Sequence, residues 1–463
     1  MLRVLFLDRS NPVFVQWIEG FSKAVSDLDV GIIFASDKER SRVSGNLEVV
    51  NVFDIPQAQD IGVLERKLGF SLHKILAPER AFFDYSSFRR CQSYSRLSLE
   101  EVGRKVVPYL NAFDYLIRER ADVVIEGLAD NFMTAMAGRI ARFYNKRFVM
   151  GYVYHWWTDG IFFVDQLDQT SSEVDRRYQH YRSHPDQIDR KRVEHVFAKK
   201  RAPQFPGRGI YPLKLRLRQL IARRKSYEPI SWRHWFCRRV SALASRVLIH
   251  KLVTRHSVPL DEDFILFPLH VSPEATLLGC EPEIADQFCL IKNISMNLPF
   301  GVRLYVKEHP AQFVGYGLDY GFYRRLTALP NVRYFRADAS IDDLFKHPRC
   351  HGVAVINGTV GLEAAMHRKP VFVFGRAPYG VGDCFLKPKS FEEFFAQVQE
   401  IRHGSHRFDE EALYAILQAL DDAVVKADID MTCYKSWSEL ALAMNPVYRK
   451  FLLMCLEESE GTT

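Results

Sequence analysis

The sequence lacks several features that would assign it to a common class of protein. No stretch approaches the ~20 consecutive apolar residues that a membrane-spanning helix needs. Its 8 cysteines are scattered, without the short spacings typical of metal or redox sites. It has no internal repeat, no low-complexity tract and no Asp-x-Asp motif at a predicted strand end. The apolar N-terminus meets Asp8 and Arg9 at once and has no small-residue cleavage site, so it is interpreted as a first buried strand. We therefore expect a cytoplasmic protein with reduced thiols and no metal site.

Size and composition point to two globular domains. A chain of 463 residues is too long for one compact core. The hydrophobic share of 47% excludes an intrinsically disordered protein. The aromatic share of 13% favours sites that stack sugars or bases.

Positive charge is concentrated in one segment. Residues 171–255 contain 22 Lys and Arg against 6 Asp and Glu, an excess of 16, so the rest of the chain carries −9 of the net +7. Trp232, Trp235 and Phe236 lie among these arginines. Such a segment can bind an anionic surface, and the inner face of the cytoplasmic membrane is the partner that we weigh first. A solvated arginine face is the alternative, and no motif supports nucleic-acid binding.

Strand and helix signals alternate in two separate parts of the chain. Apolar runs that predict buried strands lie at 4–7, 30–34, 49–52, 123–125 and 148–152, and again at 264–268, 302–306, 332–335, 353–356 and 371–374. This alternation predicts two Rossmann-like α/β domains, the GT-B architecture, in which the two domains face a cleft. We expect an N-terminal acceptor domain at 1–165, a basic helical insertion at 166–258, a donor domain at 259–409 and a helical tail at 410–463.

Two segments that follow predicted strands of the second domain could bind a phosphorylated ligand. Lys307 and His309, held by Pro310, come directly after the strand at 302–306 and can offer a charge and a hydrogen bond to phosphate. A solvated turn is the alternative interpretation. The second segment, residues 357–360, follows the strand at 353–356 and begins a helix, where exposed amides can bind anions.

The second segment consists of Asn357, Gly358, Thr359 and Val360. Glu363 follows about one turn inside the helix, within reach of ribose hydroxyls. An ordinary helix start capped by Asn357 or Thr359 is the alternative. The pairing of two anion-competent turns in one domain favours a nucleotide donor.

Three further segments are candidates for catalysis or for binding the acceptor. Glu274, four residues after His270, could be a catalytic carboxylate, although its surroundings also suit a helix cap. Glu126 or Asp130 could be the base that deprotonates an acceptor hydroxyl, and Asp130 could equally be a helix cap. The aromatic segment with His155, Trp156 and Trp157 could stack on sugar rings, with a packed seam as the alternative; His270 joins these three as a predicted substrate-binding residue.

Residues 263–379 resemble the capsule polysaccharide biosynthesis family. The match runs through the strand ending at Pro268, the Lys-x-His-Pro motif at 307–310 and the turn at 357–364. The family includes retaining GT-B Kdo transferases that use CMP-Kdo. The resemblance implies that His309, Pro310 and the turn at 358–360 hold the nucleotide phosphate.

The resemblance also bears on the catalytic residue and on the reaction. The family's Gln-x-x-x-Asp motif, whose Asp is catalytic, here becomes His270 and Glu274. The change leaves a carboxylate in place of the Asp. The resemblance as a whole implies a nucleotide-sugar donor, with a CMP-linked acid sugar as one candidate, and a lipid-linked glycan acceptor. Teichoic-acid glycerophosphotransferases have a similar Lys-x-His-Pro motif, so an alditol phosphotransferase using a CDP donor is one alternative. A non-catalytic assembly or export partner is the other.

Overall fold

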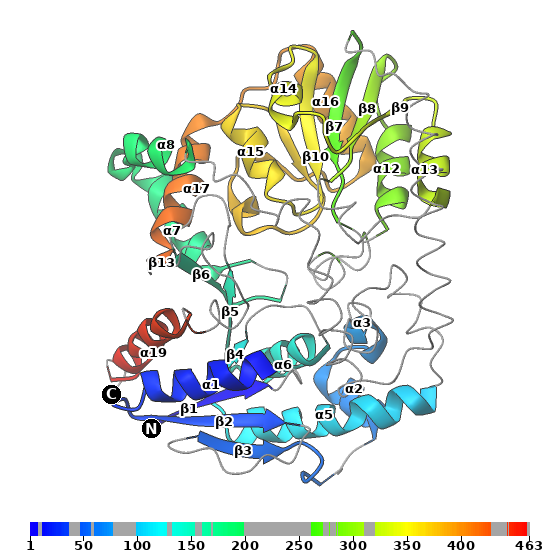
Figure 1. Ribbon diagram of the computed structural model, residues 1–463. Helices are drawn as coiled ribbons and strands as arrows, with labels where there is room; N and C mark the ends of the chain where they lie inside the picture. Colours follow the sequence, from blue (N-terminus) through cyan, green and yellow to red (C-terminus); the bar gives the residue numbers. More distant parts are fainter. Residues whose placement is uncertain are drawn as a thin grey trace, which may run out of the picture. The chain divides into compact units, whose positions relative to one another are not determined.

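The computed structural model describes most of the chain as two separate α/β units. The described residues are 1–7, 12–36, 47–56, 60–76, 99–126, 132–152, 160–167, 170–198, 261–271, 277, 284, 286–309, 320–426, 442 and 444–460. The first unit comprises Met1–Glu79, Gln92–Gln204 and Ile416–Thr463. The second comprises Arg80–Cys91 and Phe205–Ala415. Figure 1 labels the elements of both.

The sheet of the first unit has the order β13-β6-β5-β4-β1-β2-β3. Its strands are β1 (Leu2–Leu7), β2 (Val30–Ser36), β3 (Leu47–Asn51), β4 (Val123–Glu126), β5 (Arg147–Tyr152), β6 (Gly160–Val164) and β13 (Val425–Lys426). The strands from β3 to β5 are parallel, whereas β6 and β13 are antiparallel additions at one edge. Strand β13 lies within residues 410–463, which were expected to be a helical tail. This region therefore contains a short strand besides its helices.

The sheet of the second unit has the order β12-β11-β10-β7-β8-β9 and is parallel throughout. Its strands are β7 (Asp263–Pro268), β8 (Val302–Lys307), β9 (Val332–Phe335), β10 (Cys350–Val355), β11 (Val371–Val373) and β12 (Phe385–Leu386). Every strand predicted from the sequence overlaps an observed one. The prediction of two Rossmann-like domains, the pair that makes up a GT-B protein, is confirmed; the cleft between them stays a prediction.

Helices cover both sheets. Those of the first unit are α1 (Pro12–Ala24), α2 (Ile61–Leu68), α3 (Leu72–Leu76), α5 (Leu99–Glu119), α6 (Phe132–Phe143), α7 (Ser172–Ser183), η1 (Pro185–Gln187), α8 (Arg190–Ala198) and α19 (Asn445–Glu460). Those of the second are α12 (Gln287–Met296), α13 (Tyr320–Thr327), α14 (Ile341–Lys346), α15 (Val360–Met366), η3 (Pro378–Val381) and α16 (Phe391–Arg402). Helix α17 (Glu410–Asp422) begins in the second unit and ends in the first. No helix in these described ranges combines the length and hydropathy that crossing a bilayer requires.

The C-terminal helix α19 belongs to the core of the first unit. Its Tyr448 and Leu452 are fully buried against Trp17 and Phe21 of α1 and Phe6 of β1. The two helices run side by side in Figure 1. Burying side chains of this size stabilises a fold by about 1.5–3 kcal/mol each, so the end of the chain contributes strongly to the first unit.

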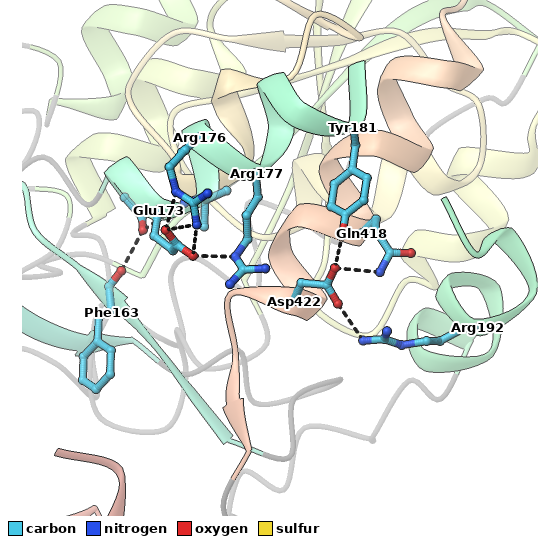
Figure 2. A network of polar contacts seen from close by, with 10 residues as sticks. Phe163, Glu173, Arg176, Arg177, Tyr181, Arg192, Gln418 and Asp422 are labelled. Atoms are coloured by element: carbon cyan, nitrogen blue, oxygen red, sulfur yellow. Dashed lines mark hydrogen bonds and ion pairs between the residues drawn. The ribbon is translucent and has the colours of Figure 1, made fainter. Parts of the chain in front are cut away.

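A polar network joins α7, α8 and α17 in the first unit. The Tyr181 hydroxyl and the Gln418 amide both donate to Asp422, the latter over 3.0 Å. Arg192 donates to the other oxygen of Asp422 over 2.9 Å and also pairs with Asp421. Figure 2 shows Tyr181, Gln418 and Arg192 converging on the Asp422 carboxylate. Burial and the Asp422 bond raise the pKa of Tyr181 to about 12, so this hydroxyl stays a donor at neutral pH.

Candidate functional site

The second sheet has a topological switch point between β7 and β10. From β7 the chain continues outward to β8 and β9, while β10, β11 and β12 extend the sheet on the other side. The connections that leave β7 and β10 therefore diverge. Open α/β sheets bind their ligands outside the carboxyl ends of the strands at such a point. Three of the predicted segments begin at this edge: they contain His270 after β7, His309 after β8 and Asn357 after β10.

The structure brings His270 against the glycine turn. A side-chain carbon built on Gly358 would lie 3.1 Å from Cε1 and 3.4 Å from Nε2 of the His270 imidazole. His270 is buried, and its backbone is held by Gln287 of α12. The Gln287 Oε1 accepts from the His270 amide over 2.8 Å, and Nε2 donates to the His270 carbonyl over 3.2 Å. These two bonds fix the backbone just beyond the end of β7 beside the turn.

Tyr379 holds the other side of the turn. Its hydroxyl, from η3, donates to the Gly358 carbonyl over 2.5 Å. A side-chain carbon on Gly361 would lie 2.5 Å from this hydroxyl oxygen and 3.0 Å from Cγ2 of Val355. Close packing therefore favours glycine at both positions, against His270 at Gly358 and against Tyr379 at Gly361.

The start of α15 does not have an ordinary side-chain cap. Thr359 is the N-cap residue, yet its side chain makes no capping hydrogen bond. Asn357 is 7% exposed, and its amide nitrogen Nδ2 has no hydrogen-bond partner among the described residues. Because leaving a buried donor unsatisfied costs about 1–3 kcal/mol, such a group is a reason to look for a ligand. Glu363 is half-buried on the same helix, and its amide bonds to the Thr359 carbonyl over 3.2 Å.

Lys307 and Glu308 at the end of β8 are buried, whereas His309 is only half-buried. The Lys307 ammonium donates to the carbonyls of Glu308 and Ala337, each over 3.2 Å. Burial lowers the pKa of Lys307 and raises the pKa of Glu308. The predicted phosphate-binding charge of Lys307 thus lies inside the fold, and its role toward a ligand stays a prediction.

The raised pKa of Glu308 predicts a pH-dependent loss of stability. At pH values above 4.5, the ordinary pKa of a glutamate, the folded protein keeps this proton where the unfolded chain has lost it. The free energy of unfolding therefore falls as the pH rises from 4.5 through the raised pKa of Glu308. A Glu308→Gln variant cannot ionise at this position. The melting temperature of the wild type, minus that of Glu308→Gln, should therefore decrease as the pH rises above 4.5. Parallel pH curves for the two proteins would contradict the shift.

The first unit has its own switch point, between β1 and β4. Glu126 ends β4 at this point and is buried, accepting a hydrogen bond from the Thr134 hydroxyl over 3.3 Å. The hydroxyl of Tyr448 in α19 donates to the Glu126 carbonyl over 3.2 Å and accepts from the Gly151 amide over 3.1 Å. The structure places Glu126 where the sequence predicted, at a strand end, while its role as a base stays a prediction.

Several predicted site residues lie outside the described residues. These are Asp130, His155, Trp156, Trp157, Glu274 and Pro310, together with Trp232, Trp235 and Phe236 of the basic segment. Their predicted roles stay predictions. Among the residues that the structure describes, no group of three or more His, Cys, Asp or Glu side chains could hold a metal ion.

The structure adds site residues that sequence reasoning did not find. Gln287 and Glu308 hold the strand ends, Tyr379 packs on the turn, and Tyr323 and Tyr334 bind Glu308. The sequence offers little signal for them, because buried polar residues on helices and strands look like ordinary surface residues until their neighbours are known. Only Glu308 stood inside a recognised motif.

Comparisons with known proteins show a family similarity for part of the chain. Residues 177–383 match the family model described as "Capsule polysaccharide biosynthesis protein". No curated protein sequence matches the chain. Among solved structures, a Thermosulfurimonas dismutans KpsC, "beta Kdo 2,4 transferase", is 14% identical over 65% of this chain and 80% of its own, with a TM-score of 0.33.

Two other solved structures overlap a larger share of the chain. Anabaena HepE in complex with UDP is 11% identical over 98% of this chain and 100% of its own, with a TM-score of 0.31. MnaA of S. aureus with UDP is 12% identical over 92% and 93%, with a TM-score of 0.26. At these TM-scores the structural overlaps carry no weight for the chemistry of this chain. The family match covers β7 to β11 with both turns of the candidate site, so residues 177–383 resemble the capsule polysaccharide biosynthesis family.

Proposed function

We propose that this protein is a GT-B glycosyltransferase of bacterial capsule or surface polysaccharide assembly. It transfers a sugar from a nucleotide-sugar donor to a lipid-linked glycan. The family match of residues 177–383 supports the biosynthetic class. The resemblance of the Lys-x-His-Pro motif and the glycine turn to Kdo transferases makes a CMP-linked acid sugar the first donor to test.

One observation carries the proposal for the donor. At the switch point of the second sheet, the buried amide nitrogen of Asn357 has no partner among the described residues. It lies beside a turn where Gly358 packs closely against His270. An amide donor here suits an oxygen of a phosphate or a sugar. His309 follows β8, two strands along the sheet from β10, and supplies a second polar group to the same edge. A nucleotide diphosphate or monophosphate needs such donors along one edge.

We assign donor binding to the second unit and acceptor binding to the first. The second unit binds the donor through His309, Pro310, Asn357, Gly358, Thr359 and Val360, with Lys307 adding positive charge from inside the fold and Glu363 binding ribose. Amides and polar side chains, rather than a metal ion, stabilise the charge on the leaving nucleotide. Glu274 is the proposed catalytic carboxylate. The first unit binds the acceptor through His155, Trp156 and Trp157, and Glu126 or Asp130 activates its hydroxyl.

The basic segment suggests where in the cell the enzyme acts. Residues 171–255 would hold the enzyme at the anionic inner face of the cytoplasmic membrane, where a lipid-linked phosphorylated acceptor is found.

A thermal-shift screen against CMP, CDP, UDP, GDP and dTDP tests the donor. A ligand that binds only the folded protein at 100 times its Kd stabilises it by about 2.7 kcal/mol, which raises the melting temperature measurably. We expect CMP to give the largest shift. A shift with CDP alone would favour the alditol phosphotransferase, and UDP or GDP would indicate a hexose donor. No shift with any nucleotide at millimolar concentration would contradict the proposal and favour a non-catalytic partner.

A matched variant separates site binding from general stabilisation. Asn357→Asp keeps the shape of the side chain but replaces the amide donor by a carboxylate that repels phosphate. It should remove the nucleotide shift, while Asn297→Asp, in a residue whose amide bonds to the Asn293 carbonyl at the end of α12, should keep it. Loss of the shift in both variants, or in neither, would count against the Asn357 site.

A further inference from the structure

Glu308 is a buried acid at the end of β8 that the proposed chemistry does not use. Glu308 is 1% exposed, although it lies just beyond the carboxyl end of β8, where the chain leaves the sheet and a solvated glutamate would cost nothing. Burying a carboxylate is unfavourable unless hydrogen bonds satisfy it. The burial of Glu308 so close to the candidate site therefore suggests that this side chain has a function there.

Three donors from three elements meet on this carboxylate. The hydroxyls of Tyr323 in α13 and Tyr334 in β9 both donate to Oε2, the second over 2.5 Å. The backbone amide of His309 donates to Oε1 over 3.2 Å. The two tyrosine rings pack edge to face, with centroids 5.5 Å apart, and both are buried. The carboxylate is thus held on one side by rigid rings and holds the next peptide group on the other.

The same arrangement fixes the backbone around His309. The Glu308 amide continues the β8–β9 pairing by donating to the Phe335 carbonyl over 2.9 Å, and Lys307 donates to the Glu308 carbonyl. Both ends of the Glu308 residue and its side chain are therefore tied to the fold. The peptide that leads into His309 is therefore held on both sides before any ligand binds.

We propose that Glu308, clamped by Tyr323 and Tyr334, is a positioning residue that orients His309 for the nucleotide of the donor. That the ligand is a donor nucleotide rests on the proposed function. Lys307 and Glu308 then form the frame of the motif, and His309 is the group that they present. Preorganising a binding group in this way lowers the entropy lost when a ligand binds.

The test is a double-mutant cycle on nucleotide affinity. The Kd of the nucleotide that most stabilises the wild type is measured by calorimetry for Glu308→Ala, His309→Ala and the double variant. We expect Glu308→Ala to weaken binding about tenfold, the value of one lost hydrogen bond, and to have no further effect once His309 is alanine. Independent, additive losses would overturn the proposal.

Conservative variants keep the test valid if Glu308→Ala does not fold. Glu308→Gln retains an oxygen for the His309 amide and should bind nucleotide within about threefold of the wild type. Tyr323→Phe and Tyr334→Phe each remove one donor and should fall between wild type and Glu308→Ala. Tyr305→Phe, at a fully buried tyrosine of the same strand, is the control and should lower stability without changing the Kd. A Kd unchanged in both Tyr323→Phe and Tyr334→Phe would overturn the proposal.

A readout without nucleotide distinguishes failure of this proposal from failure of the proposed function. Selective ¹⁵N labelling of the 15 histidines gives a backbone amide signal for His309, assigned by its loss in His309→Ala. The signal should shift, and its amide exchange should accelerate, in Tyr334→Phe and Glu308→Ala but not in Tyr305→Phe. If wild type binds no nucleotide but this pattern is seen, the clamp is retained and the donor assignment is wrong. An unmoved His309 signal would remove the clamp itself.

Discussion

Replacing Gly358 with valine should nearly abolish nucleotide binding while leaving the protein folded. A first side-chain carbon at this position already lies 3.1 Å from the His270 ring, so alanine requires a shift of a few tenths of an ångström. Valine adds two methyl groups at the same point and must displace His270 or the turn itself. We expect Gly358→Ala to weaken nucleotide binding about tenfold and Gly358→Val at least a hundredfold, roughly 2.7 kcal/mol, measured by calorimetry.

A nearby glycine provides the matched control for this series. Gly380, in η3 of the same unit, would place a side-chain carbon only 3.9 Å from that of Ala377, an ordinary contact. Gly380→Ala should therefore keep both the melting temperature and the Kd of the wild type. If Gly358→Val binds nucleotide as well as Gly380→Ala does, the ligand does not occupy the switch point.

Gly361→Val should destabilise the second unit more than any other single change considered. The new side chain would meet the Tyr379 hydroxyl at 2.5 Å and Val355 at 3.0 Å, inside a core with no spare volume. Overpacking of this kind costs about 1–3 kcal/mol, occasionally more, and outweighs the gain of up to about 1 kcal/mol from removing glycine from a helix. Urea denaturation of Gly361→Ala and Gly361→Val should show a graded loss.

A second cycle identifies the residue responsible for the clash. Tyr379→Phe removes the hydroxyl that lies closest to Gly361, at the cost of its bond to the Gly358 carbonyl. In the Tyr379→Phe background, Gly361→Ala should cost at least 0.5 kcal/mol less than in the wild type, about the smallest coupling energy expected of residues in contact. Equal costs in the two backgrounds would mean that Val355, rather than Tyr379, limits the space at Gly361.

Local sequence patterns predicted most of the two sheets. Apolar runs followed by turn residues are short-range signals, and the strands that they predict, such as β7 and β10, overlap the observed ones. The exceptions have local causes. Strands β12 and β13 contain two residues each, too few for a hydrophobic period to be visible. Strand β6 is antiparallel and lies beyond the alternating pattern of strands and helices.

The candidate site was predicted in outline from the same patterns. His270, His309 and Asn357 were expected at one edge because parallel strands place their carboxyl ends together. The contact of the His270 ring with Gly358 was not predictable, since it depends on β7 and β10 being neighbours in the sheet. The role of Thr359 was open between a cap and a ligand contact, and the structure shows no capping bond from its side chain.

By itself, the sequence determined the α/β class, the positions of the strands and the residues at their ends, because hydrophobic period and turn chemistry act over a few neighbouring residues. Only the tertiary structure decided which strand ends are adjacent, and therefore which polar groups share the switch point. It also decided that Glu308 turns inward to Tyr323 and Tyr334, and that α19 completes the core of the first unit. These outcomes depend on packing between segments far apart in the chain, where burial and hydrogen-bond geometry, not local preference, set the lowest free energy.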